Sequence, residues 1–270
     1  MTLAAVDTVF AGSIPQLYQS HLVPLIFQPY ADDLARRVAA RRVSGVLEIA
    51  CGTGVATRAL DAALPATVKI VPTDLNAAML DQARALGTQR NVDWRTADAM
   101  SLPFADGAFD GVVCQFGAMF FPDRVHAFSE ARRVLAPGGA FLFNVWDRIE
   151  DNEFADVVTD VLAAMFPKDP PQFMARTPHG YHDADAVTHD VMRAGFPKPR
   201  IETLSARSVA PNALQAAIAY CQGTPLRSEI ESRGGSLEEA TRACARALEA
   251  RFGTGTIDGK IQALVVTAER

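Results

Sequence analysis

The chain has 270 residues, of which 49% are hydrophobic and 21% are charged, so it holds enough apolar material for one large core. This balance excludes a disordered, collagen-like or disulfide-scaffold protein. The formal net charge of −5 argues against the broad cationic surface that a nucleic-acid partner requires.

The cysteines and the apolar segments indicate neither a metal site nor a membrane protein. The four cysteines form no Cys-x-x-Cys pair and have no histidine at metal-ligand spacing. The chain does not begin with a basic stretch and an apolar run, and no window approaches the roughly 20 apolar residues that span a bilayer. We therefore expect a cytoplasmic protein with free thiols, no metal and no membrane segment.

The first half of the chain changes from a helical pattern to alternating strands and helices. Residues 1–42 are helical in pattern, with Pro29 as a candidate break and Asp32 or Asp33 as a candidate N-cap. Residues 43–147 alternate short apolar runs with helical patterns, which is typical of right-handed βαβ units. The expected helices are 57–64 and 77–86, and the expected strands are 46–50, 68–73, 92–96, 109–115 and, after the turn Pro137-Gly138-Gly139, 140–146.

The second half is expected to contain two long insertions between the last strands. It holds a helix at 152–165, a proline-rich stretch at 167–178, a strand at 200–207, a helical block at 211–252 and a last strand at 260–268. The insertions are too long for simple connections, so we expect at least one to cover the working edge of the sheet. The predicted fold is α/β and doubly wound, a Rossmann-like, mainly parallel seven-stranded sheet in a single domain over 1–270. That domain comprises an N-terminal helical lid (1–42), a core (43–147) and substrate-side insertions (148–198 and 208–258).

The strongest functional signal is the segment Val46–Gly54, a buried strand that runs into a turn with two glycines and then a helix. Gly52 and Gly54 suit a sharp backbone turn that a ligand approaches closely. Asp74 follows about 20 residues later at the end of the next strand, where a carboxylate can accept both hydroxyl protons of a ribose. This spacing predicts an adenosine-type ligand at the carboxyl ends of the strands.

A dinucleotide site has a similar topology but fits these residues less well. Thr57 is β-branched in a region where the dinucleotide fingerprint has glycine or alanine for close helix packing. Glu48 would also repel a pyrophosphate, whereas it suits a ligand with a positive charge such as an α-amino group.

These residues resemble the class I S-adenosylmethionine-dependent methyltransferases, in particular the small-molecule group that includes the ubiquinone and menaquinone biosynthesis type. The resemblance covers residues 43–147 and has four motifs in order. The first motif, which implies contact with the methionine end of the cofactor, is matched by Glu48, Ala50, Cys51, Gly52 and Gly54. The second, which implies a ribose carboxylate and apolar cover for the adenine, is matched by Asp74, Leu75 and Met79. The third, whose aspartate would reach the adenine amino group, is matched by Asp98 and Ala99, followed by Met100. The strand 109–115, which ends at Gln115, and the run 133–139 complete the set.

Each motif also has a purely structural interpretation. Gly52 and Gly54 form a tight turn in any case, Asp74 can cap a helix that begins near Asn76, and Asp98 can be a loop carboxylate. The agreement of four motifs in register favours cofactor binding over these alternatives. Cys51 is expected to matter through its small size and its backbone, with a reactive thiol as the alternative.

The residues that would face a methyl acceptor are less clearly marked. Phe116 and Phe120 follow the fourth strand and are four residues apart, which suits either an apolar lid or core packing. Tyr18 and His21 lie in the N-terminal segment, which in related enzymes folds over the cofactor. No catalytic acid or base is marked, since in-line methyl transfer needs mainly positioning and a deprotonated acceptor.

The sequence therefore predicts transfer of a methyl group from S-adenosylmethionine to an O, N or C atom of a small hydrophobic or neutral molecule, with S-adenosylhomocysteine as product. One alternative is a non-catalytic module that binds S-adenosylmethionine, and another is a nicotinamide-dependent oxidoreductase. The expected partner is a small-molecule acceptor, with no nucleic acid and no membrane, and a homodimer is left open. The acceptor, the general base and the pathway are not specified by any motif.

Overall fold

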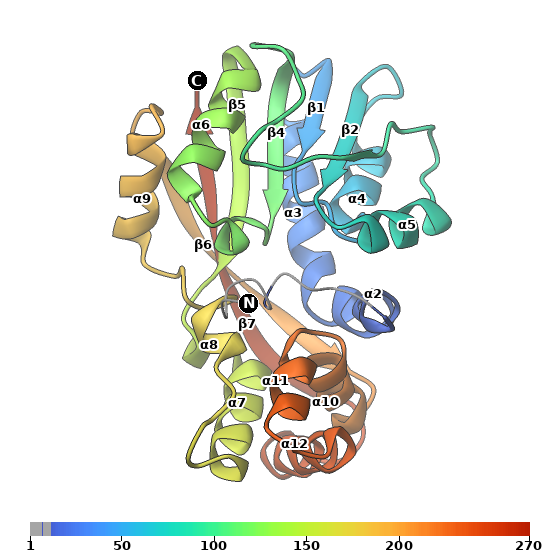
Figure 1. The fold of residues 1–270 in the computed structure, drawn as a ribbon. Helices are drawn as coiled ribbons and strands as arrows, with labels where there is room; N and C mark the ends of the chain where they lie inside the picture. Colours follow the sequence, from blue (N-terminus) through green and yellow to red (C-terminus); the bar gives the residue numbers. More distant parts are fainter. Residues whose placement is uncertain (1–6, 8–11) are drawn as a thin grey trace. The chain divides into compact units, whose positions relative to one another are not determined.

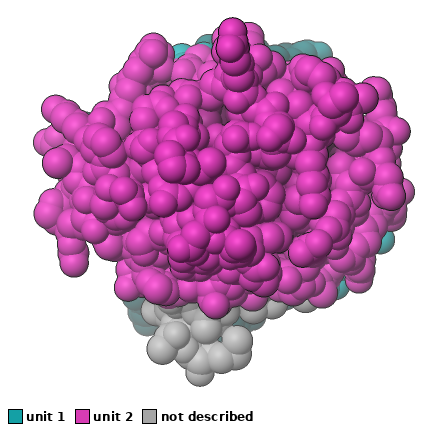
Figure 2. Space-filling view, turned by 90° about the horizontal axis from the view of Figure 1, so that it is seen from above, with its two compact units in different colours: residues 1–27, 146–180, 205–262 teal, residues 28–145, 181–204, 263–270 magenta. Residues whose placement is uncertain are grey.

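The computed structural model describes Asp7 and residues 12–270, which fall into two compact units (Figures 1 and 2). Unit 1 comprises residues 1–27, 146–180 and 205–262 and is teal in Figure 2. Unit 2 comprises residues 28–145, 181–204 and 263–270 and is magenta. The first residues of the expected lid, 1–6 and 8–11, lie outside the described part of the chain.

A mixed, mostly parallel seven-stranded sheet has the order β3-β2-β1-β4-β5-β7-β6 (Figure 1), which confirms the predicted fold class. The strands are β1 (Gly45–Glu48), β2 (Lys69–Asp74), β3 (Arg95–Thr96), β4 (Phe109–Gln115), β5 (Leu135–Trp146), β6 (Arg200–Ala210) and β7 (Ile257–Glu269). The β1 strand pairs in parallel with both β2 and β4, so that Leu47 lies beside Val71 on one side and Val112 on the other. From β1 the strands follow one another toward β3 on one side and, from β4 onward, on the other side, so the strand order reverses between β1 and β4. In such sheets ligands bind at this point, beyond the carboxyl ends of the strands.

Unit 2 buries both faces of its part of the sheet under helices. These helices are α3 (Gln28–Ala39), α4 (Val55–Ala63), α5 (Ala77–Leu86), the 3₁₀ helix η2 (Ala118–Phe120), α6 (Arg124–Val134) and α9 (Ala184–Arg193). Leu34 of α3 and Leu60 of α4 share one buried cluster with Leu142 of β5. Phe128 of α6 packs on the neighbouring β5 residues Phe141 and Phe143, with ring centroids 5.5 and 5.0 Å apart. Because consecutive strand residues point to opposite faces, β5 is covered on both sides.

Several boundaries in unit 2 differ from the expected ones: β3 begins at Arg95 rather than residue 92, and α4 at Val55 rather than residue 57. The α3 helix begins at Gln28 rather than near residue 34, directly after a π-helix at Tyr18–Phe27, and Pro29 lies in its first turn. Asp33 is therefore not an N-cap, and it accepts hydrogen bonds from Arg36 and Arg37 instead. The β5 strand begins at Leu135, because Pro137-Gly138-Gly139 forms an irregularity inside the strand rather than a turn before it.

Unit 1 is built mainly from helices. They are α2 (Ile14–Leu17), the π-helix η1 (Tyr18–Phe27), the 3₁₀ helix η3 (Ile149–Asp151), α7 (Glu153–Met165), α8 (Phe173–Arg176), α10 (Ala213–Gln222), α11 (Leu226–Ser232) and α12 (Leu237–Phe252). The expected helical block 211–252 is thus three helices, two of which begin at the side-chain caps Asn212 and Ser236. The α10 and α12 helices pack together, and the buried Cys221 and Cys244 lie on these two helices.

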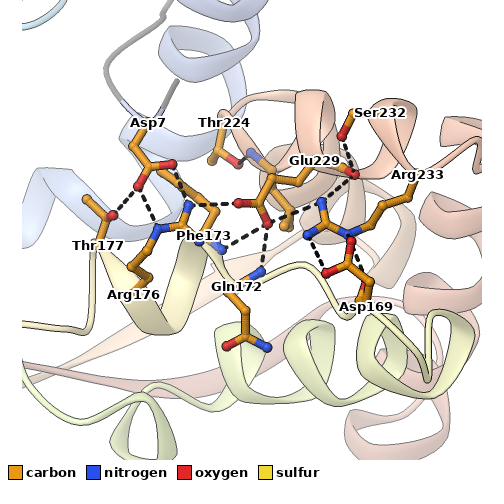
Figure 3. Close-up of polar contacts among 11 residues, drawn as sticks. Asp7, Asp169, Gln172, Phe173, Arg176, Thr177, Thr224, Glu229, Ser232 and Arg233 are labelled. Atoms are coloured by element: carbon orange, nitrogen blue, oxygen red, sulfur yellow. Dashed lines mark hydrogen bonds and ion pairs between the residues drawn. The ribbon is translucent and has the colours of Figure 1, made fainter. Parts of the chain in front are cut away.

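A buried ionic network joins the start of the chain to α8 and α11 within unit 1 (Figure 3). Arg176 donates to both carboxylate oxygens of Asp7, at 3.0 and 2.6 Å, and to Glu229 at 2.7 Å. Glu229 also accepts from the backbone N–H groups of Gln172 and Phe173 at the start of α8. The two carboxylates are almost fully buried, so their charge is balanced by the arginine and by backbone donors.

Within the described residues, no helix is both long enough and apolar enough to cross a bilayer. The same part of the chain contains no group of three or more His, Cys, Asp or Glu residues placed to hold a metal ion.

Candidate cofactor-binding site

The turn after β1 requires a backbone that most side chains disfavour. Ala50, Gly52 and Gly54 have φ angles of +54°, +56° and +81°. A Cβ atom on Gly54 would lie 2.7 Å from Cη2 of Trp94, so glycine is needed there for space as well as for conformation. Among the described residues, Ala50 and Phe116 are the two non-glycine residues with positive φ, and they follow the neighbouring strands β1 and β4. Strain of this kind clusters at ligand sites.

Asp74 ties the end of β2 to the glycine turn. Its Oδ2 accepts a hydrogen bond from the Gly52 N–H at 2.7 Å, and its Oδ1 accepts one from the Asn76 N–H at 2.7 Å. Burial raises the pKa of Asp74 above its ordinary value, while these backbone donors act in the opposite direction. The cap of α5 is Asn76, whose side chain accepts from the N–H groups of Ala78 and Met79. Asp74 is thus not the helix cap.

Glu48 is buried at the last position of β1. Its Oε2 accepts a hydrogen bond from Oγ1 of Thr57 in α4, at 2.5 Å. Burial raises the pKa of Glu48 to about 8, and the negative charge of Asp74 also raises it. At neutral pH the carboxyl group therefore holds a proton, which a cation placed beside it would displace.

The two thiols near this edge, Cys51 and Cys114, are protonated at neutral pH. Cys51 is buried, and its backbone N–H donates to the Thr73 carbonyl at 2.9 Å. Burial raises its thiol pKa well above the ordinary value, and burial raises that of Cys114 to about 12. Because the thiolate is the nucleophile, both side chains are unreactive at neutral pH. This disfavours a reactive role for Cys51.

The residues expected to cover an adenine lie beyond β2 and β3. Leu75 is 64% exposed although it is large and apolar, whereas Met79 is buried with its Cε 3.5 Å from the position of a Cβ on Gly52. Asp98 is exposed and accepts from the Met100 N–H at 2.9 Å, and Ala99 beside it is buried. An apolar surface next to a carboxylate suits a ring that is stacked on one side and hydrogen-bonded at its edge.

The structure brings together the twelve residues expected to bind cofactor, all in unit 2 at or just beyond the carboxyl ends of β1 to β4. They are Glu48, Ala50, Cys51, Gly52, Gly54, Asp74, Leu75, Met79, Asp98, Ala99, Met100 and Gln115. The binding roles of these residues stay predictions.

The residues expected near an acceptor are divided between the units. Phe116, in unit 2, is buried and packs edge-on against Tyr30 with ring centroids 5.2 Å apart, and Phe120 on η2 is half-buried. Tyr18 and His21 lie on η1 in unit 1. Tyr18 stacks on Phe27 at 4.9 Å, and Nδ1 of His21 lies 2.7 Å from Oγ of Ser20.

Three residues that the motifs did not single out also shape this edge. The buried hydroxyl of Thr53, between the two glycines, has no hydrogen-bond partner in the described part of the chain. Gly117 allows close contact between turns, because a Cβ there would lie 2.5 Å from Cβ of Ala50. Asn144 is fully buried on β5, and a lone polar residue in the apolar run 140–146 was the signal that could have identified it.

The comparisons with known proteins agree with the motifs. Residues 47–143 match the sequence model of a family described as a methyltransferase domain. A demethylmenaquinone methyltransferase of Lactiplantibacillus plantarum is 42% identical over 97 residues, which is 34% of this chain and 41% of that protein. One from Thermus thermophilus is 41% identical over 111 residues, or 40% of this chain and 49% of that protein. The chain thus spans less than half of the length of these curated relatives.

Solved structures agree in fold at low sequence identity. The YcgJ protein from Bacillus subtilis has a TM-score of 0.56 and 17% identity, over 90% of this chain and 98% of that one. The [4+2]-cyclase SpnF has a TM-score of 0.52 and 19% identity, over 90% of this chain and 83% of that one. At these identities the likeness concerns the fold. The sequence resemblance is confirmed over residues 47–143, which match a methyltransferase domain.

Proposed function

We propose, from the methyltransferase domain at residues 47–143, that this chain transfers the methyl group of S-adenosylmethionine to an O, N or C atom of a small hydrophobic or neutral molecule, giving S-adenosylhomocysteine. The observation that carries the proposal is the pair of acids at the ends of neighbouring strands. Asp74 is held by the backbone N–H groups of Gly52 in the glycine turn and of Asn76, and Glu48 is buried one strand away.

The two acids suit the two ends of this cofactor. The backbone donors orient the Asp74 carboxylate, which then accepts the ribose hydroxyl protons. Glu48 offsets the positive charge of the α-amino group. Leu75 and Met79 cover the adenine, and Asp98 accepts from its amino group. A pyrophosphate would instead give Glu48 no cation to pair with, and its negative charge would raise the pKa of this carboxyl group further.

The chemistry needs little from protein side chains beyond position. When bound, S-adenosylmethionine would supply an electrophilic methyl group on its sulfonium, and the residues of this edge would hold it in line with the acceptor. An in-line approach at near-contact distance accounts for most of the acceleration. The raised thiol pKa values of Cys51 and Cys114 keep these sulfurs protonated, so they do not compete as acceptors.

A binding module without catalysis is the second candidate. One observation favours it: the proposal assigns the acids Glu48, Asp74 and Asp98 to the cofactor, which leaves none of these three as a general base for an acceptor. Turnover of S-adenosylmethionine to S-adenosylhomocysteine with an acceptor panel separates the two functions.

Titration calorimetry tests the cofactor. We expect micromolar binding of S-adenosylmethionine and S-adenosylhomocysteine and no binding of oxidised or reduced nicotinamide dinucleotide. Asp74→Ala should weaken binding by about tenfold or more, because hydrogen bonds to a charged group are lost. Asp93→Ala is the matched control, since Asp93 is exposed and paired with Arg95. Binding of dinucleotides alone, or an Asp74→Ala protein that binds as tightly as the wild type, would contradict the proposal.

A further inference from the structure

Asn144 is a polar residue in an otherwise apolar strand. It lies near the carboxyl end of β5, opposite Gln115 in the parallel β4–β5 ladder, and its side chain is fully buried. The strand residues on either side of it, Phe143 and Val145, are buried apolar side chains. A hydrophobic residue of similar volume would fill this space equally well, so packing alone does not explain why an amide is present at this position.

The side-chain oxygen of Asn144 holds one particular backbone group. The Phe116 N–H donates to Oδ1 of Asn144 at 3.0 Å and also to its backbone carbonyl at 3.2 Å. Phe116 has a φ of +50°, a left-handed conformation that a bulky residue adopts only when its surroundings enforce it. The second acceptor turns the chain sharply after β4 instead of letting the strand continue.

This turn is packed against the glycine turn of the first motif. A Cβ on Gly117 would lie 2.5 Å from Cβ of Ala50, so the backbones after β4 and β1 are in close contact. Ala50 is itself left-handed. The position of the cofactor turn therefore depends on the turn that Asn144 holds.

The NH2 group of the Asn144 amide is buried without a hydrogen-bond partner among the described residues. A buried donor without a partner lowers stability, and native proteins keep few of them. The protein thus retains a destabilising group in order to place an uncharged oxygen acceptor at Phe116.

We propose that Asn144 is a positioning residue for cofactor binding: its Oδ1 fixes the left-handed turn at Phe116, and through Gly117 this turn fixes the glycine loop that receives S-adenosylmethionine. The inference rests on the proposed function. The inference predicts opposite effects on stability and on binding. Removal of the amide removes a buried unpaired donor, which favours stability, and it also removes the acceptor that fixes the turn, which weakens binding.

Asn144→Leu tests this separation, since leucine has a similar size and no polar atom. We expect S-adenosylhomocysteine to bind about tenfold or more weakly by calorimetry, because the turn loses its fixing hydrogen bond. The unfolding temperature without ligand should be equal to or above that of the wild type. Asn144→Asp keeps an oxygen at Phe116, and burial keeps its carboxyl group protonated, so it should bind within about threefold of the wild type.

Phe143→Leu is the matched control on the same strand. Phe143 packs on Phe128 and away from the turn, so this variant should lose stability and keep its affinity. Asn144→Leu that binds like the wild type, that loses stability in step with affinity, or that fails to fold would overturn the inference. A crystal structure of Asn144→Leu with Phe116 still left-handed would overturn it too. If the wild type itself does not bind S-adenosylhomocysteine, the proposed function fails instead.

Discussion

Glu48 should couple cofactor binding to proton release. Burial raises its pKa to about 8, so at pH 7 the carboxyl group of the free protein holds a proton. A bound α-ammonium group favours the carboxylate, and the proton must then leave. Calorimetry at pH 7 in two buffers of different ionisation enthalpy should show the release of close to one proton per S-adenosylmethionine, and Glu48→Gln should abolish it.

Glu130→Gln is the control for that experiment. Glu130 pairs with Arg133, which holds its pKa below the ordinary value, so this acid is already ionised at pH 7. The variant should release the same number of protons as the wild type. Equal binding enthalpies in both buffers for the wild-type protein would mean that Glu48 does not meet a cation.

The same residue predicts how stability depends on pH. Between the ordinary pKa of 4.5 and the raised value of about 8, the native state keeps the Glu48 proton while the unfolded state loses it. The contribution of this group to stability therefore falls as pH rises across that window. Glu48→Gln should flatten the dependence of the unfolding temperature on pH from 5 to 8, and an unchanged slope would contradict the raised pKa.

At the scale of the element, the turns after β1 and β4 approach as closely as their atoms allow. A Cβ on Gly117 would lie 2.5 Å from Cβ of Ala50 and 2.8 Å from Sγ of Cys114, although the φ of Gly117 is not strained. We expect Gly117→Ala to weaken S-adenosylhomocysteine binding by at least about tenfold, because overpacking must displace the glycine turn. In Gly111→Ala on β4, where the closest contact is 3.6 Å, calorimetry should show nearly unchanged affinity.

Arg176, at the end of α8, links α8 to α11 and to Asp7 in the buried network of unit 1 (Figure 3). Hydrogen bonds to Asp7 and Glu229 raise its pKa above the ordinary value, so it is charged at every accessible pH. Arg176→Met would leave the buried Asp7 carboxylate without the arginine and Glu229 with Arg233, 3.9 Å away, and we expect a loss of about 3 kcal/mol in urea unfolding. Arg227→Met removes the exposed pair with Glu231 and should cost less than about 1 kcal/mol. Equal losses would mean that the network is not a major source of stability.

The elements themselves were largely predictable, but some of their ends were not. All seven expected strands exist and most contain an apolar run between turn residues, although β3 is reduced to the exposed residues Arg95 and Thr96. The start of β5 was wrong because pairing with β4 accommodates Pro137-Gly138-Gly139 as an irregularity in the ladder. The start of α3 was wrong because η1 runs directly into α3 at Gln28, so the chain before Leu34 is already helical and Asp33 pairs with Arg36 and Arg37 instead of capping.

The candidate site also contains residues that were predictable from the sequence and residues that were not. The glycine turn and Asp74 were predictable because their chemistry depends on local order along the chain. Gly117 and Asn144 were not, because their roles arise across strands: Asn144 acts on Phe116, which is 28 residues away in the sequence. The register of the β4–β5 pairing, rather than any local sequence pattern, places the Asn144 amide beside Phe116.

At the scale of the whole molecule, β5, β6 and β7 each contribute residues to both units. Local periodicity showed where the strands lie but not how contacts group them into two units. A strand pairs along its length and loses these hydrogen bonds cooperatively, so the shared strands should couple the unfolding of the two units. A ligand that binds one unit would then stabilise both.

The two tryptophans allow this coupling to be measured, because Trp94 lies in unit 2 and Trp146 in unit 1. Trp146→Phe leaves fluorescence from unit 2, and Trp94→Phe leaves fluorescence from unit 1. S-adenosylhomocysteine at 100 times its dissociation constant adds about 2.7 kcal/mol to the stability of whatever unfolds with its site, which is roughly 5 °C for a chain of this size. We expect both variants to show the same rise, each relative to its own ligand-free transition. A rise reported by Trp94 alone would show that the shared strands do not couple the units, and that each unit unfolds by itself.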